Sequence, residues 1–222
     1  GVPARDWDDT GFWQCGDLNI DGQMDCGYNA LFAALQKIAT MNSNMMSGKS
    51  SLYHLHDYEE VLPRIALDFT CGENNMLHNF LVFKGIEAKG IEMGADISKE
   101  KGLNIKGDIT KFRTAGITLD SIKFATRQNH DRLTYIIGAT ELSIASDDEE
   151  NSQSALLYGS IKCDTITSNF ILRDNIKKTD SKVGLTALLK PGNMHIHFSP
   201  EAMLFGSPYA FNRENYIEIG KK

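Results

Sequence analysis

The sequence predicts an α+β protein, with helices in its first part and strands in its second. Apolar residues recur at helical spacing between about residue 20 and residue 90. From about residue 91 to residue 222, short runs of apolar and β-branched residues alternate with turn residues, which is typical of strands. The chain has 222 residues, 41% of them hydrophobic, enough for a sizeable core. We therefore expect one domain over residues 1–222, with a helical lobe and a β-rich lobe.

The chemistry is expected at the start of the first helix. Asp25 is a residue type preferred at an N-cap, and this would place Cys26 in the first helical turn. The positive end of the helix dipole favours a thiolate there, and Gly27 leaves the sulfur open to a substrate. Cys26 is therefore a candidate nucleophile, and the alternative is a small apolar residue at a helix start. The expected apolar stripe of this helix consists of Tyr28, Leu31, Leu35 and Ile38, with Phe32 and Ala34 beside it.

Further elements follow from local patterns. Residues 52–67 are expected to be helical around Pro63, and the spacing of Met76, Phe80 and Phe83 predicts another helix. Near the C-terminus, residues 183–189 and 194–198 are expected to form a strand pair joined by a turn over residues 190–193.

Charge and composition exclude several partners. The formal net charge is 23 − 29 = −6 and no basic run is present, which excludes a nucleic-acid partner. No apolar run approaches the length of a membrane-spanning helix. The four widely spaced cysteines indicate reduced thiols, a cytoplasmic location in the producing or host cell, and no structural zinc. His54 and His56 are the one pair that suggests a metal half-site, but no third ligand cluster accompanies them, so we expect neither metal nor cofactor.

A cysteine nucleophile requires a general base, and two histidines are candidates. His195 and His197 lie in an alternating segment, so both rings are expected on one face of a strand. His195 is the first choice because it follows the turn at Gly192, and His197 is the alternative base.

The segment Cys26-Gly-Tyr-Asn-Ala-Leu resembles the Cys-x-x-Asn-Ala helix start of papain-like cysteine proteases of RNA viruses, especially picornaviral leader proteases and the papain-like proteases of coronaviruses and other nidoviruses. Asp21-Gly before Cys26 also resembles the start of ovarian-tumour-type deubiquitinases, with two more residues of spacing. The viral resemblance implies a papain-like two-lobed fold, in which a helical lobe carries the cysteine and an antiparallel β lobe carries the histidine. It also implies an orienting residue after the histidine. Asn212, 17 residues after His195, is the first choice and Glu214 the second.

This resemblance implies a thiol hydrolase that cleaves peptide bonds through an acyl-enzyme, in a viral polyprotein or in a ubiquitin-like isopeptide substrate. Gln23 and Asn19 are the side-chain candidates for the oxyanion hole. The alternatives are a papain-fold glutamine deamidase or acyltransferase, and a non-catalytic interaction domain in which Cys26 belongs to the core.

Overall fold

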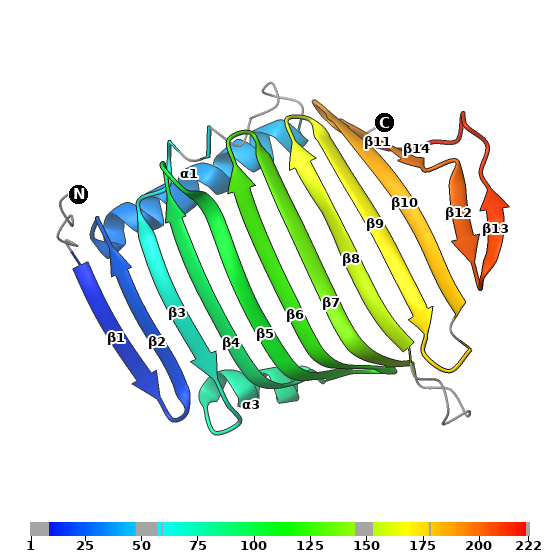
Figure 1. Cartoon of the computed structure of the whole chain (residues 1–222). Coiled ribbons are helices and arrows are strands. Elements are labelled where there is room, and N and C mark those ends of the chain that lie inside the picture. The colour runs from blue at the N-terminus through cyan, green and yellow to red at the C-terminus, as the bar shows by residue number, and fades with distance from the viewer. Residues whose placement is uncertain (1–8, 48–56, 59, 145–152, 178, 221–222) are drawn as a thin grey trace, which may run out of the picture.

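A single antiparallel sheet dominates the molecule. The computed structural model describes residues 9–47, 57–58, 60–144, 153–177 and 179–220. Strands β1 to β11 lie side by side in chain order, and β14 pairs with the outer edge of β11 (Figure 1). The predicted papain-like fold with a helical lobe is therefore wrong. Residues 20–90 contribute strands to the same sheet as residues 91–222, and the two described helices accompany that sheet.

The elements in chain order are β1 (Asp9–Cys15), β2 (Leu18–Met24), α1 (Tyr28–Met46), β3 (Ile65–Cys71), α3 (Met76–Phe83), β4 (Glu87–Ser98), β5 (Gly102–Thr114), β6 (Ile117–Asn129), β7 (Arg132–Ile144), β8 (Gln153–Lys162), β9 (Thr165–Asp174), β10 (Thr179–Lys190), β11 (Asn193–Phe198), β12 (Glu201–Leu204), β13 (Ser207–Ala210) and β14 (Ile217–Gly220). The β10–β11 hairpin confirms the strand pair and turn predicted there. Strand β3 shows that the prediction of a helix extending to residue 67 is wrong, and residues 52–56 of that segment lie outside the described residues.

Helix α1 begins two residues later than the sequence predicts. The carbonyl of Gly27 accepts the first two helical N–H bonds, at 2.9 and 3.2 Å, and the helix starts at Tyr28. Asp25 is not its cap, because the Asp25 carboxylate instead accepts the backbone N–H of Arg64 at 2.9 Å. Cys26 therefore lies in the link between β2 and α1, before the first helical turn.

Helix α1 packs on one face of the sheet through a stripe shifted from the predicted one. Ala34 and Met41 are buried, and Leu31 and Ile38 are half-buried, which gives spacings of three, four and three residues. Leu35 is 49% exposed, so its predicted place in the stripe is wrong.

Helix α3 confirms the helical spacing predicted around Phe80. Its N-cap is Asn75, whose side-chain oxygen accepts the backbone N–H of His78 at 2.8 Å. The amide of Asn75 also donates to Asp17 Oδ1 at 2.6 Å, which ties the start of the helix to the β1–β2 turn. The helix thus stands at the end of β3 and packs on the first residues of β4.

Four neighbouring strands are distorted along one line near their lower ends. Gly90 in β4 and Ser121 in β6 have positive φ angles of 58° and 50°, and Thr110 of β5 lies between them in the register. The β7–β8 register shifts between Ala139 and Leu142. Glycine adopts a positive φ without steric cost, so Gly90 suits this position. The strands bend in this region of the sheet (Figure 1).

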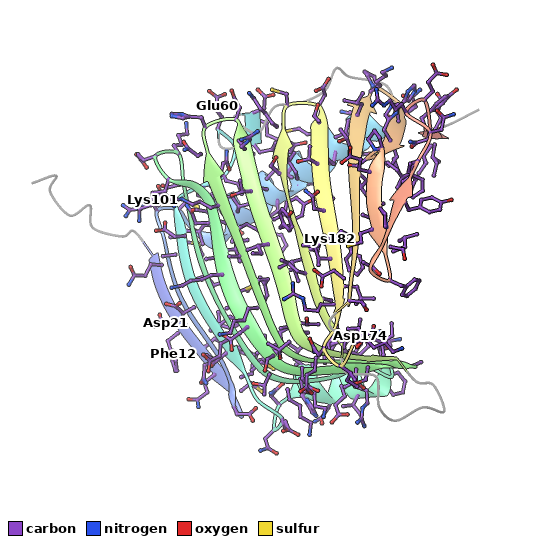
Figure 2. All side chains as sticks on the ribbon, turned by 45° about the vertical axis from the view of Figure 1, so that its right-hand side comes forward. Phe12, Asp21, Glu60, Lys101, Asp174 and Lys182 are labelled. Carbon is purple, nitrogen blue, oxygen red and sulfur yellow. The ribbon has the colours of Figure 1, made fainter. Side chains whose placement is uncertain are left out.

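The sheet buries few side chains completely. The chain exposes 14691 Å², whereas a compact protein of this mass exposes roughly 10,000 Å². Among the described residues, no side chain is less than 2% exposed. Side chains stand on both faces of the strands, as Figure 2 shows. The buried apolar residues are Leu18, Ala34, Met41, Cys71, Ala88, Ile122, Leu133 and Ala187.

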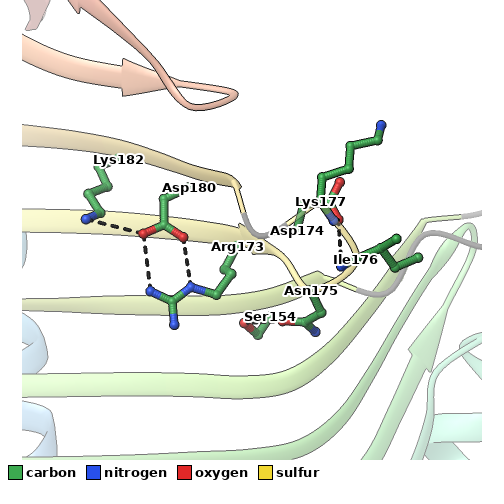
Figure 3. Close-up of polar contacts among 8 residues, drawn as sticks. All are labelled: Ser154, Arg173, Asp174, Asn175, Ile176, Lys177, Asp180 and Lys182. Carbon is green, nitrogen blue, oxygen red and sulfur yellow. Dashed lines mark hydrogen bonds and ion pairs between the residues drawn. The ribbon is translucent and has the colours of Figure 1, made fainter.

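The β9–β10 hairpin is held by a short network of charges (Figure 3). Arg173 donates through Nε and Nη2 to the two carboxylate oxygens of Asp180, at 2.8 and 3.2 Å. Lys182 Nζ lies 3.3 Å from Asp180 Oδ2. In the turn, Asp174 Oδ1 accepts the N–H groups of Ile176 and Lys177 at 2.9 and 2.8 Å. The hydrogen bond from Arg173 is the main reason that the pKa of Asp180 falls from 3.8 to about 2.

This network predicts a pH dependence of stability at the acidic end. Because the pKa of Asp180 is lower in the folded chain than in the unfolded chain, its stabilising effect is present above pH 3.8 and is lost as the pH falls through about 2. The melting temperature of Asp180→Asn should therefore lie below that of the native chain at neutral pH, and the difference should shrink as the pH falls towards 2. A difference that stays constant between pH 5 and pH 2 would contradict this assignment.

Candidate functional site

The register of the sheet aligns apolar side chains into a row across ten strands. Directly paired residues of antiparallel strands share a face, so the pairing can be followed from strand to strand. From β1 to β10, the row consists of Trp13, Ile20, Phe69, Met93, Gly107, Phe124, Ile137, Leu157, Phe170 and Val183. We call this the central row. Nine strand spacings of about 4.8 Å make it roughly 43 Å long.

Two further rows on the same face continue the pattern. The one beside the central row consists of Leu67, Ala95, Ile105, Thr126, Tyr135, Gly159, Ser168, Leu185 and Phe198. The next consists of Ile65, Ile97, Leu103, Gln128, Leu133, Ile161, Ile166, Ala187 and Ile196. None of the residues in these three rows is charged. We call the surface that they form the apolar face.

The opposite face of the sheet has a different character, and we call it the polar face. The residue neighbouring Phe69 on this face is Asp68, which pairs with Asp21 of β2 on one side and Gly94 of β4 on the other. The polar face of β2 to β6 also carries Asn19, Thr70, Glu92, Asp108, Lys123, Asp96, Lys106 and Arg127. Over β2 to β6 the sheet is therefore amphipathic. On β7 to β9 the same face carries Ile136, Leu156, Tyr158 and Ile171.

Helix α1 crosses the upper ends of the strands and leaves the rest of the apolar face uncovered by that helix (Figure 1). Ile38 of the helix lines a cavity of about 300 Å³ together with Ile97 and Leu103 of the sheet. The central row stays open further along, where Ile137 is 43% exposed and Phe170 is 42% exposed. An exposed apolar surface that extends over many strands indicates a binding surface.

A small polar patch interrupts the middle of the apolar face. The hydroxyl of Tyr135 donates to the carbonyl oxygen of Thr167 at 3.0 Å and also contacts the hydroxyl of Ser168. The Tyr135 side chain passes over Gly159, where an added Cβ would lie 2.6 Å from the Tyr135 hydroxyl oxygen. The Tyr135 hydroxyl is thus satisfied by its own chain and needs no hydrogen-bond partner from outside the sheet.

The structure does not bring the predicted nucleophile and base together. Cys26 follows β2, and His195 lies on β11, near the other side of the sheet (Figure 1). Strands β3 to β10 lie between them, so the separation along the sheet is roughly 43 Å at about 4.8 Å per strand. Gln23 and Asn19 lie on β2 and are equally remote from His195. The amide of Asn19 donates to Thr70 Oγ1 at 3.2 Å.

The two histidines belong to a cluster that joins β14 to β11. His195 Nε2 lies 3.4 Å from Glu218 Oε1, and its ring stacks on Tyr216 with the centroids 5.9 Å apart. His197 Nδ1 lies 2.8 Å from the carbonyl oxygen of Asn215. Residue order does not identify Glu218 or Tyr216 as partners, because their place follows from the β11–β14 register. This arrangement fixes an edge strand and does not require a substrate.

Asn212, the predicted orienting residue, makes a local contact. Its side-chain oxygen accepts the backbone N–H of Glu214 at 3.0 Å, which is a turn bond over two residues. Glu214 itself is exposed. The hydrogen bond to His197 comes from the carbonyl of Asn215, so this contact does not involve the Asn212 side chain.

The four cysteines form no disulfide. Burial raises the pKa of the Cys71 thiol, which is only 2% exposed and contacts Asn75. The described residues contain no group of three or more His, Cys, Asp or Glu side chains placed to hold a metal ion, and His54 and His56 lie outside those residues.

Comparison of the chain with protein-family models, with curated proteins and with solved structures gave no match. The papain-like activity thus remains a prediction from the motif at Cys26, and the strand order does not bring Cys26 together with His195 or His197. Neither described helix combines the length and the apolar character that crossing a bilayer requires.

Proposed function

We propose that this chain is a binding module whose apolar face holds the alkyl chain of an amphipathic ligand such as a fatty acid. The observation that carries the proposal is the central row, in which apolar residues and one glycine follow one another across ten strands with no charged residue. The row is roughly 43 Å long at about 4.8 Å per strand. One lipid acyl chain spans about half of a bilayer core of roughly 30 Å, so the row is long enough for more than one such chain.

The chemistry of the apolar face favours an alkyl chain over a protein partner. A typical protein interface carries roughly one hydrogen bond per 100–200 Å² of buried area. The apolar face offers few side-chain polar groups, and the Tyr135 hydroxyl among them is already bonded within the sheet. Methylene groups need no hydrogen bonds, and each one buried contributes about 0.8 kcal/mol. Aliphatic and aromatic side chains supply that contact.

A series of fatty acids of increasing chain length tests the proposal. Calorimetric titration of the chain with octanoate, decanoate, laurate and palmitate should give affinities that rise with length. Full burial of one methylene corresponds to about 0.8 kcal/mol, or roughly fourfold in affinity. The increase should continue over the series, because the central row is longer than any of these ligands.

Two results would overturn the proposal. One is an absence of binding at every chain length, and the other is an affinity that does not depend on length. Sedimentation of the ligand-free chain is a separate test of the same proposal. A stable dimer that palmitate does not dissociate would assign the apolar face to a second copy of the chain.

A further inference from the structure

Helix α3 exposes an apolar stripe that does not pack on the sheet. Its inward side chains, Leu77, His78 and Leu81, are half-buried. On the outward side, Met76 is 69% exposed, Phe80 54% and Phe83 81%. These three follow one another at spacings of four and three residues, so they form one stripe along the helix. Val82 beside them is exposed, and Asn79 is the polar residue of this surface.

A cation flanks the stripe at the helix end. Lys84 Nζ lies 5.8 Å from the ring centroid of Phe80 and 5.5 Å from that of Phe83. Within the described part of the chain, Lys84 forms no ion pair, whereas the nearby Lys89 is paired with both Glu73 and Glu87. The outward surface of α3 therefore combines exposed phenylalanines with one positive charge that no described carboxylate pairs with.

We infer that α3 docks this chain reversibly on the surface of a lipid bilayer that contains anionic lipids. Phenylalanine and methionine side chains insert at the boundary of head groups and acyl chains, while a neighbouring lysine remains at the level of the phosphates. The charge of Lys84, which has no ion-pair partner among the described residues, complements an anionic head group. The helix lies on the surface and does not cross it.

The size of the helix argues against a stable protein partner. Eight residues at 1.5 Å each make a helix of about 12 Å. A stable protein interface buries about 800 Å² on each partner, which is far more than one side of such a helix offers. Interfacial docking needs only a few apolar side chains and a nearby cation. The inference depends on α3 alone and stands apart from the proposed function of the apolar face.

Flotation with vesicles tests the inference. The full chain should float with vesicles of phosphatidylcholine and phosphatidylglycerol, and more weakly with phosphatidylcholine alone. Phe80→Ser combined with Phe83→Ser should weaken vesicle binding by at least about tenfold, because the apolar contact is removed. Lys84→Gln should reduce binding to the anionic vesicles and leave binding to the neutral ones unchanged.

Phe205 provides a matched control. It is 81% exposed, as Phe83 is, but lies between β12 and β13. Phe205→Ser should float as the native chain does, and circular dichroism should show all variants folded. Palmitate binding by the Phe80→Ser, Phe83→Ser chain should stay unchanged, so the outcome is separate from the test of the apolar face.

Failure of the native chain to float would overturn the inference, as would flotation that the serine substitutions do not weaken. A concentration-dependent dimer that Phe83→Ser converts to a monomer would also overturn it, because the stripe would then be a contact between two copies.

Discussion

Replacing Ile137 by glutamate should abolish most of the binding of palmitate, whereas the same replacement at Ile136 should leave it intact. The two residues are neighbours on β7 with nearly equal exposure, 43% for Ile137 and 47% for Ile136. Ile137 pairs with Phe124 and Leu157 in the central row. Ile136 pairs with Ala125 and Tyr158 and so points to the other side of the sheet. The pair of variants therefore separates the two faces with one chemical change.

The expected size of the effect follows from the burial of the ligand. A glutamate in the central row removes an apolar contact and forces the alkyl chain against a carboxylate that requires water. We expect a loss of about 2–3 kcal/mol, or roughly 30- to 150-fold in affinity. Calorimetric titration of both variants with palmitate measures this loss. Since each native side chain is already over 40% exposed, both variants should keep their melting temperature within a few degrees.

The Ile136→Glu variant also decides between two explanations of weak binding. Equal losses in both variants would indicate that a negative charge repels the anionic ligand from anywhere on the sheet, and this would contradict a site on one face. Replacing each isoleucine by lysine checks the point. Ile137→Lys loses an apolar contact while its positive charge attracts the anionic head group, so the two effects oppose each other. In Ile136→Lys no apolar contact with the ligand is lost.

The sequence alone predicts much of the later half of the sheet. Residues 183–189 form a largely apolar run before Lys190-Pro-Gly-Asn193 and residues 194–198 alternate in type after it, and the structure pairs Lys190 with Asn193 at that turn. The spacing of Met76, Phe80 and Phe83 likewise predicts α3. In these segments a local signal, either a turn or a helical period, determines the local structure.

The earlier half is harder to predict because its local signals compete. Strand β3 carries apolar residues at alternate positions from Ile65 to Cys71, yet Pro63 before it is also typical of a helix start. Asp25 before Cys26 has the features of an N-cap, but its carboxylate and its N–H both bond to the backbone of Arg64, next to the start of β3. A contact across 39 residues is not visible in local sequence.

The candidate site depends on register more than on any motif. Each strand of the apolar face alternates on its own, but whether Phe69 and Phe170 belong to one row depends on every pairing between β3 and β9. The order of Cys26 and His195 along the chain fits a papain-like enzyme, while the strand order separates them. The sequence gives the side chains that are available for a site, and the strand order determines which of them lie close together.

Gly159 should be the position on the apolar face where one added methyl group destabilises the fold most. Its Cβ would overlap the backbone carbonyl oxygen of Thr167 and would lie 2.6 Å from the hydroxyl oxygen of Tyr135. A backbone atom in the centre of a sheet cannot move without disturbing its ladder, and the Tyr135 side chain is held there by its bond to Thr167 at 3.0 Å. Overpacking of this kind costs about 1–3 kcal/mol, and contact with backbone places Gly159→Ala at the upper end.

The neighbouring strand offers the same substitution without the clash. An added Cβ at Gly138 of β7 would meet Leu156 Cδ1 at 3.6 Å and the carbonyl oxygen of Ala155 at 3.9 Å, which are ordinary contacts. Gly138→Ala should therefore be neutral or slightly stabilising, by about 0.4–1 kcal/mol, because alanine restricts the unfolded chain. Urea unfolding of both variants measures the difference. Equal stabilities would show that the β8–β9 pairing at Gly159 is looser than described, and Tyr135→Phe would then lose little stability as well. A loss confined to Gly159→Ala, with Tyr135→Phe costing about 1 kcal/mol, would establish the Tyr135 contact as a fixed part of the apolar face.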